Sequence, residues 1–154
     1  MQKSFTHSPV ENFIEQMGLI TQADGGPRIA GRILGLMIVE ERPFTLQEIA
    51  ERLNISKASA STNARMLAER GVLRLLAHGG DRQDYYELGP DPFHRMLQTI
   101  EDRMRKSAAV IAEAEARFTD ADDDARRRVA RLANFYRQSA DFLGEWAKRL
   151  TLDQ

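Results

Sequence analysis

Residues 45–71 carry the pattern of two short helices separated by four residues, and this arrangement constrains the fold more than any other feature. The first segment begins with Thr-Leu-Gln-Glu at 45–48, a spacing in which threonine and glutamate cap a helix reciprocally. The connection "LNIS" ends at Ser56, a favourable N-cap for the second segment. Gly71 comes directly after the second segment, and helices commonly end with a glycine in the left-handed backbone conformation at this position. The pattern predicts a helix-turn-helix.

The second of these helices has two contrasting faces. Ala60, Ala64 and Leu67 recur at intervals of four and three residues, so we expect them to face the core and to let this helix lie close to its predecessor. The opposite face carries Ala58, Ser61, Thr62 and Arg65. Serine and threonine are mediocre helix formers because their hydroxyls compete for backbone groups. This face is therefore either a solvated surface or one that must lie close to a partner.

A β-hairpin is predicted directly after the helix-turn-helix. The segments "VLRLLA" (72–77) and "YYEL" (85–88) are strand-like, and "HGGDRQD" (78–84) between them has the Gly-Gly pair of a hairpin loop. Tyr85 and Tyr86 alternate along the second strand, so one should pack in the core and the other should face outward. A helix-turn-helix followed by a hairpin is a winged helix.

Two helices are predicted ahead of this motif. Ser8 and Pro9 mark the start of the first helix, and Pro27 opens a second that runs to about Glu40 and is apolar on most sides. Its Gly31 and Gly35 either let another backbone approach closely or are simply tolerated, at about 1 kcal/mol each relative to alanine.

Two long amphipathic helices are predicted after the hairpin. Each has apolar residues alternating at intervals of three and four, a heptad pattern, over 93–118 and 129–150. A small winged helix cannot bury both apolar faces, so a second chain is the expected partner. We therefore expect a mainly α (α+β) fold with three regions. These are an N-terminal helix contributing to the dimer interface (1–26), a winged helix-turn-helix (27–90) and a helical dimerisation region (91–154).

Charge and composition narrow the function classes. The chain of 154 residues has a net charge of -1, but residues 52–82 hold six basic and two acidic residues, a local +4 against -5 elsewhere. A basic patch in a neutral protein is compatible with a polyanionic partner. No cysteine is present, which excludes disulfides and thiolate zinc sites. No apolar run is long enough to span a membrane, and the first residues lack the pattern of a secretory signal, so we expect a cytoplasmic protein without a membrane partner.

No catalytic or metal-binding pattern is present. His7, His78 and His94 lie in three separate elements without ligand spacing, so no metal site is predicted. The acidic run "DADDD" lacks the glycine and terminal glutamate of a calcium loop. No nucleophile–base pair or phosphate loop occurs, and neither an enzyme nor a cofactor is expected. The aromatic residues Phe135, Tyr136, Phe142 and Trp146 are either dimer core or a cage for a quaternary ammonium group.

Residues 27–88 resemble MarR-type winged-helix transcription regulators, and most closely the GbsR-like branch. The motifs that carry the resemblance are "GRILG", "SKASAS", "LAERGVL" and especially "GDRQDYYE". The resemblance implies a homodimeric DNA-binding regulator, expected to be a repressor of a palindromic operator. The second helix of the motif would lie in the major groove, with the wing over the minor groove or backbone. Members of the GbsR-like branch are linked to choline and osmoprotectant genes, but no ligand is carried over to this chain.

This resemblance gives the residues of the second helix and the wing specific roles. Ser61, Thr62 and Arg65 would reach base edges, while Ser56 and Lys57 would hold phosphate. Asn63, beside the buried side, is either a DNA contact or a hydrogen-bonding residue of the helix packing. Arg82 at the tip of the wing would enter the minor groove, oriented by Asp81 or Asp84.

Two further expectations follow. A small-molecule effector, if the protein has one, would bind between the winged domain and the long helices, because a site there can change the spacing of the two reading helices of a dimer. The alternative function from another class is a winged-helix protein-interaction module that does not bind DNA.

Overall fold

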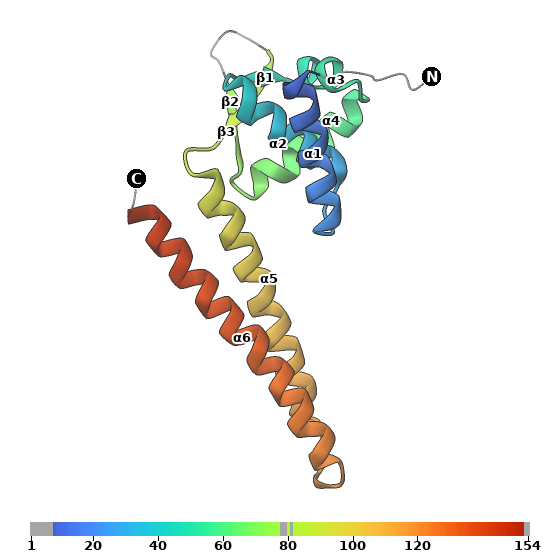
Figure 1. Cartoon of the computed structure of the whole chain (residues 1–154), viewed down its shortest axis with the longest axis vertical. Coiled ribbons are helices and arrows are strands. Elements are labelled where there is room, and N and C mark those ends of the chain that lie inside the picture. Colours follow the sequence, from blue (N-terminus) through green and yellow to red (C-terminus); the bar gives the residue numbers. More distant parts are fainter. Residues whose placement is uncertain (1–7, 78–79, 81, 153–154) are drawn as a thin grey trace. The chain divides into compact units, whose positions relative to one another are not determined.

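A computed structural model describes residues 8–77, 80 and 82–152 (Figure 1). The chain divides into two compact units, which meet in sequence between Pro92 and Phe93. The first contains α1 (Pro9–Ala23), α2 (Arg28–Glu40), β1 (Phe44–Thr45), α3 (Leu46–Leu53), α4 (Lys57–Glu69), β2 (Leu73–Ala77) and β3 (Asp84–Leu88). The second contains α5 (Pro92–Glu115), a 3-10 turn η1 (Asp120–Asp122) and α6 (Asp123–Leu152). The predicted fold class, mainly helical with a winged helix, is confirmed. Among the described residues, no helix is both long enough and apolar enough to cross a membrane.

The first unit has a continuous hydrophobic core built from α1–α4 and the sheet. The sheet is antiparallel with the order β1-β3-β2, and Tyr86 of β3 lies between Phe44 of β1 and Leu75 of β2 in register. Tyr86 is buried whereas Tyr85 is partly exposed, which confirms the predicted alternation. The largest fully buried side chains are Ile14, Ile33, Leu36, Met37, Phe44 and Ile49.

The helix ends lie where the capping residues predict them. Ser56 accepts a hydrogen bond from the Ser59 backbone N–H at 3.0 Å, which caps α4. Gly71, with a φ of +74°, follows α4, and Asn54, with a φ of +51°, ends α3. These local rules fix the lengths of both helices of the motif and the short turn between them.

The capping box of α3 is complete. The Thr45 hydroxyl accepts from the Glu48 backbone N–H at 3.1 Å, and the Glu48 carboxylate accepts from the Thr45 backbone N–H at 2.8 Å. This backbone hydrogen bond, reinforced by Arg42, outweighs partial burial and holds the pKa of Glu48 below its ordinary value. The carboxylate's contribution to stability is therefore present above the ordinary glutamate pKa and is lost as the pH falls through the lowered value.

Thr45→Ala should lower the stability of the winged unit by about 0.5–2 kcal/mol, because it leaves the Glu48 N–H without its cap. Thr45→Ser keeps the hydroxyl and should cost less. Urea unfolding followed by circular dichroism measures both. Equal losses for the two variants would show that the threonine methyl group, and not the cap, carries the effect.

Helices α1 and α2 lie in close contact through glycine. A Cβ atom built on Gly31 would lie 2.3 Å from the Met17 carbonyl oxygen, and one on Gly35 would lie 3.1 Å from Met17 Cβ. Of the two alternatives for these glycines, close approach of another backbone is therefore confirmed.

The second unit buries much less apolar surface. In its described part the buried side chains are alanines: Ala108, Ala133, Ala140 and Ala147. The last three are seven residues apart and share one face of α6, which faces α5 because the Ala147 carbonyl lies 3.0 Å from His94 Nδ1. Leu132 and Trp146, predicted to be part of the apolar seam of α6, are 49% and 47% exposed. Small alanines occupy the side of α6 turned toward α5, so Leu132 and Trp146 stay at the surface of the single chain. That a second chain covers this seam remains a prediction.

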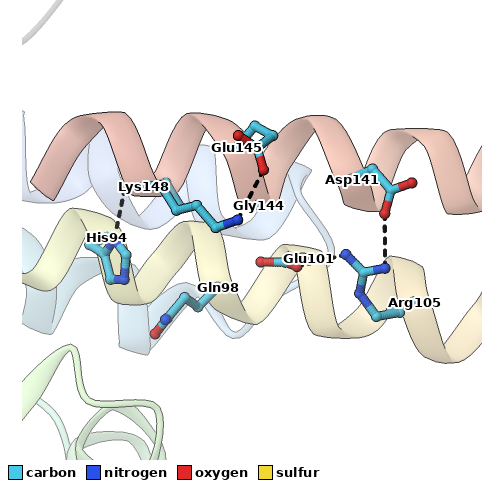
Figure 2. A pocket seen from close by; sticks show the side chains of 9 residues that line it. His94, Gln98, Glu101, Arg105, Asp141, Gly144, Glu145 and Lys148 are labelled. Atoms are coloured by element: carbon cyan, nitrogen blue, oxygen red, sulfur yellow. Dashed lines mark hydrogen bonds and ion pairs between the residues drawn. The ribbon is translucent and has the colours of Figure 1, made fainter.

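Charged and polar side chains line a cavity of about 300 Å³ between α5 and α6 (Figure 2). Arg105 of α5 contacts Glu101 on its own helix at 2.8 Å and Asp141 of α6 at 3.0 Å. Lys148 pairs with Glu145 one turn earlier on α6, at 2.9 Å. Polar contacts therefore join α5 and α6 on this side, while the large apolar side chains Leu132 and Trp146 are exposed to solvent.

Candidate nucleic-acid interface

Helix α4 is held by its alanine side and leaves its small polar side exposed. Ala60 and Ala64 are fully buried and Leu67 is 7% exposed, so this side packs into the core as predicted. Lys57, Ala58, Thr62 and Arg65 are exposed, and Ser61 is partly exposed. We call Lys57, Ala58, Ser61, Thr62 and Arg65 the reading face of α4.

The reading face offers hydrogen-bonding groups on short side chains and one long cation. The Arg65 guanidinium lies 3.4 Å from the Ser61 hydroxyl, one turn earlier on the same helix. This contact is long and exposed, so it leaves the guanidinium able to turn toward a ligand. Short hydroxyl side chains let a helix approach a base edge closely, and arginine can pair bidentately with guanine.

The N-terminus of α4 combines a capped backbone with a cation. The Ser56 hydroxyl accepts from Ser59 N–H and contacts the Ser59 hydroxyl at 2.9 Å, so this side chain acts as the helix cap. Lys57 follows at the first helical position and is exposed. Backbone N–H groups and the helix dipole at such an end favour an anion, and phosphate is a suitable one.

Asn63 lies on the packing side and not on the reading face. Its side chain is 9% exposed, and its amide donates to the Ser59 carbonyl at 2.9 Å. Of the two interpretations given by its position in the sequence, the structure favours the helix-packing one. We therefore leave Asn63 out of the proposed DNA contacts.

The wing places Arg82 at the surface beside the hairpin loop. Arg82 is exposed, and Asp84, which begins β3, is exposed as well. Asp81, the other residue expected to orient Arg82, lies outside the described residues. Further along the hairpin, Arg74 of β2 and Glu87 of β3 are cross-strand partners and form an ion pair.

The part of the chain that the structure describes gives no support for a metal site. Within it, no group of three or more histidine or acidic side chains could hold a metal ion. His94 contacts the Ala147 carbonyl, and the predictions for His7 and His78 concern residues outside the described ranges. Phe135, Phe142 and Trp146 are exposed along α6, and Phe135 meets Tyr136 edge-on with ring centroids 5.7 Å apart.

The sequence did not reveal the residues that hold the helix-turn-helix against α1. Arg32 of α2 contacts Glu15 of α1 and the Leu53 carbonyl at the end of α3. Arg52 of α3 contacts Glu11 of α1 and Glu40 of α2. Arg28 and Arg32 lie one helical turn apart on α2 and both contact Glu15, whereas Glu11 pairs with Arg52 of α3. No regular spacing in the sequence signals these pairs.

Comparison with known proteins agrees with this geometry. A family model described as MarR family matches residues 24–84. The chain is 39% identical over 85 residues to the HTH-type transcriptional regulator MmpR5 of Mycobacterium tuberculosis, a match that covers 54% of this chain and 52% of that protein. Over 87 residues it is 29% identical to the putative HTH-type transcriptional regulator YvaV of Bacillus subtilis, with 56% and 49% covered. The chain thus spans about half the length of the curated relatives it matches.

A solved structure extends the likeness to both units. The crystal structure of a transcriptional regulator, 28% identical in sequence, superposes with a TM-score of 0.68 and covers 92% of this chain and 99% of the other. The matched family segment contains α2–α4, β1, β2 and the start of β3, including the whole reading face. Residues 24–84 of this chain match the MarR family model, and they fold as a winged helix-turn-helix.

Proposed function

We propose that this protein binds double-stranded DNA as a homodimer and regulates transcription, acting as a repressor at a palindromic operator. The observation that carries the proposal is the reading face, which presents two hydroxyls and a guanidinium on a helix held by buried alanines. In this docking mode α4 lies in the major groove, Lys57 and the helix N-terminus contact phosphate, and Arg82 lies at the minor groove.

The dimer is supported by the exposed apolar side chains of α6. Leu132, Phe135, Phe142 and Trp146 are between 47% and 70% exposed, and their spacing of three, seven and four residues places them on one face of the helix. We call these four residues, three of which are aromatic, the aromatic stripe. Monomeric soluble proteins rarely expose a contiguous apolar surface of this kind, so a second copy of the chain is its expected cover.

Titration of the protein into genomic DNA fragments at several salt concentrations tests the proposal. Binding that weakens steeply with salt is expected, because lysine and arginine displace counterions from phosphate. A protein-interaction module without DNA function, the competing interpretation, would give no shift at low salt and would instead capture a protein partner.

Lys57→Ala and Arg65→Ala should have different effects on DNA binding. Lys57→Ala should weaken binding to all sequences alike and lower the salt slope by about one unit per lost phosphate contact. Arg65→Ala should cost roughly 1–3 kcal/mol at the preferred site and relax the preference at one base pair in each half-site. Selection from random DNA with the wild type and both variants measures the difference.

Two-fold symmetry makes this test stringent. The relaxed positions should be mirrored, with half-site centres about one helical turn apart. If Arg65→Ala leaves the selected motif intact while Lys57→Ala rewrites it, the assignment of the reading face is wrong.

We also propose membership of the GbsR-like branch, supported by the motifs "GRILG" and "GDRQDYYE" in this sequence. A small-molecule effector is part of this proposal. A compound that raises the melting temperature and also changes operator affinity would qualify as an effector, whereas one that only stabilises the protein would not.

A further inference from the structure

Arg32 connects three helices of the winged unit through one guanidinium. It lies on α2, its Nε donates to Glu15 Oε1 of α1 at 2.7 Å, and its Nη2 donates to the Leu53 carbonyl of α3 at 2.8 Å. The side chain is 20% exposed, so these contacts are formed mostly away from water. Charged hydrogen bonds in such a setting are stronger and more directional than surface ion pairs.

The Leu53 carbonyl is a sensitive place for such a contact. Leu53 is the last residue of α3, where backbone carbonyls lack partners within the helix, and a cation there also complements the helix dipole. Asn54 and Ile55 form the turn, and Ser56 caps α4. Arg32 therefore holds the chain at Leu53, three residues before Ser56, the cap of α4.

A second arginine binds α1 to the same region. Arg52 of α3 contacts Glu11 of α1 at 2.7 Å and Glu40 of α2 at 2.8 Å. Partial burial opposes ionisation of Glu15, but hydrogen bonds and charge from Arg28 and Arg32 outweigh it, and its pKa lies below the ordinary value. Glu15 is therefore ionised at neutral pH, and α1 presents two carboxylates, one turn apart, to the helix-turn-helix.

We propose that Arg32 is a positioning residue for DNA recognition, which sets the direction of α4 by fixing the α3–α4 turn to α1 through Leu53 and Glu15. The inference rests on the proposed DNA-binding function. Hydrogen bonds to base edges tolerate little displacement, whereas phosphate contacts by flexible lysine and arginine side chains tolerate more. Loss of Arg32 should therefore reduce discrimination between sequences while leaving non-specific binding in place.

The test compares full-length variants on the duplex selected by the wild type and on a scrambled duplex of equal length. Arg32→Gln should lower the ratio of the two affinities about tenfold, the size expected for one well-formed charged hydrogen bond. Glu15→Ala should lower the ratio in the same direction, since it frees the α1 end of the connection. Arg32→Lys keeps the charge but lacks the planar fork, whose two nitrogens reach Glu15 and the Leu53 carbonyl separately, and should give an intermediate ratio.

Arg28→Gln is the matched control. Arg28 donates to the same Glu15 carboxylate at 3.0 Å, but its side chain is 50% exposed and contacts α1 rather than the α3–α4 turn. This variant should keep the wild-type ratio. Melting temperatures and circular dichroism of all variants separate positioning from loss of fold.

The outcomes divide cleanly. If the wild type selects no sequence, the proposed function is wrong, and this result is distinct from a failure of the positioning role. If the wild type selects a motif and Arg32→Gln keeps its ratio, or Arg28→Gln loses as much as Arg32→Gln, the positioning role is overturned. If Arg32→Gln lowers the ratio but Glu15→Ala does not, the part assigned to α1 is wrong.

Discussion

Replacing Phe142 and Trp146 by glutamate should convert the proposed dimer into a monomer. These side chains are 70% and 47% exposed in the single chain, so the substitutions should leave the fold of the chain unchanged. In a two-fold interface each new carboxylate occurs twice and must lose its hydration against an apolar partner. We expect the dimer dissociation constant to rise by at least about 100-fold, measured by sedimentation velocity over a range of concentrations.

Arg137→Glu supplies the control, because it places a carboxylate on an exposed position of the same helix outside the aromatic stripe. It should remain dimeric. The monomeric variant should also lose most of its operator affinity, since each half-site would be bound separately. If the stripe variant remains a dimer, the interface lies elsewhere, and the exposed Leu19 and Ile20 of α1 become the next surface to change.

The local structure of the winged unit could be predicted from the sequence because its signals act over three or four residues. Thr45 and Glu48 cap each other, Ser56 caps α4, and Gly71 follows α4, all as their positions indicate. The reading face follows from the helical period, since small alanines at 60 and 64 mark the buried side. Asn63 lies at the edge of that side, where periodicity cannot decide between packing and exposure.

Contacts between distant residues could not be predicted in the same way. Arg32 is 17 residues from Glu15 and 21 from Leu53, and a backbone carbonyl has no sequence signature. The apolar faces of α6 raise a different difficulty. This helix has one face of alanines and an adjacent face of large apolar residues, and periodicity does not distinguish the face that meets α5 from the face left for another chain.

The contact between α1 and α2 carries the prediction with the largest expected effect on stability. At Gly31 an added Cβ would lie 2.3 Å from the Met17 carbonyl oxygen and 2.4 Å from Thr21 Oγ1, well inside van der Waals contact. The first of these atoms is backbone, so relief requires α1 to move as a whole. Such a movement would uncover Ile14, which is 1% exposed, and would separate Glu15 from Arg32.

Gly31→Leu should therefore destabilise the winged unit by at least about 3 kcal/mol, because overpacking against backbone cannot be relieved by a rotamer change. For a unit of this size that corresponds to a fall in Tm of more than about 12 °C, measured by calorimetry. Gly35→Ala is the graded comparison on the same helix, since its added Cβ would lie 3.1 Å from Met17 Cβ and 3.2 Å from Ile14 Cα, so α1 needs to shift by only a few tenths of an ångström. The gain in helix propensity, about 1 kcal/mol, should offset much of that cost. If Gly31→Leu has the same Tm as the wild type, α1 does not pack on α2 as described. The contact between Arg32 and Glu15 of α1 could then not position the α3–α4 turn.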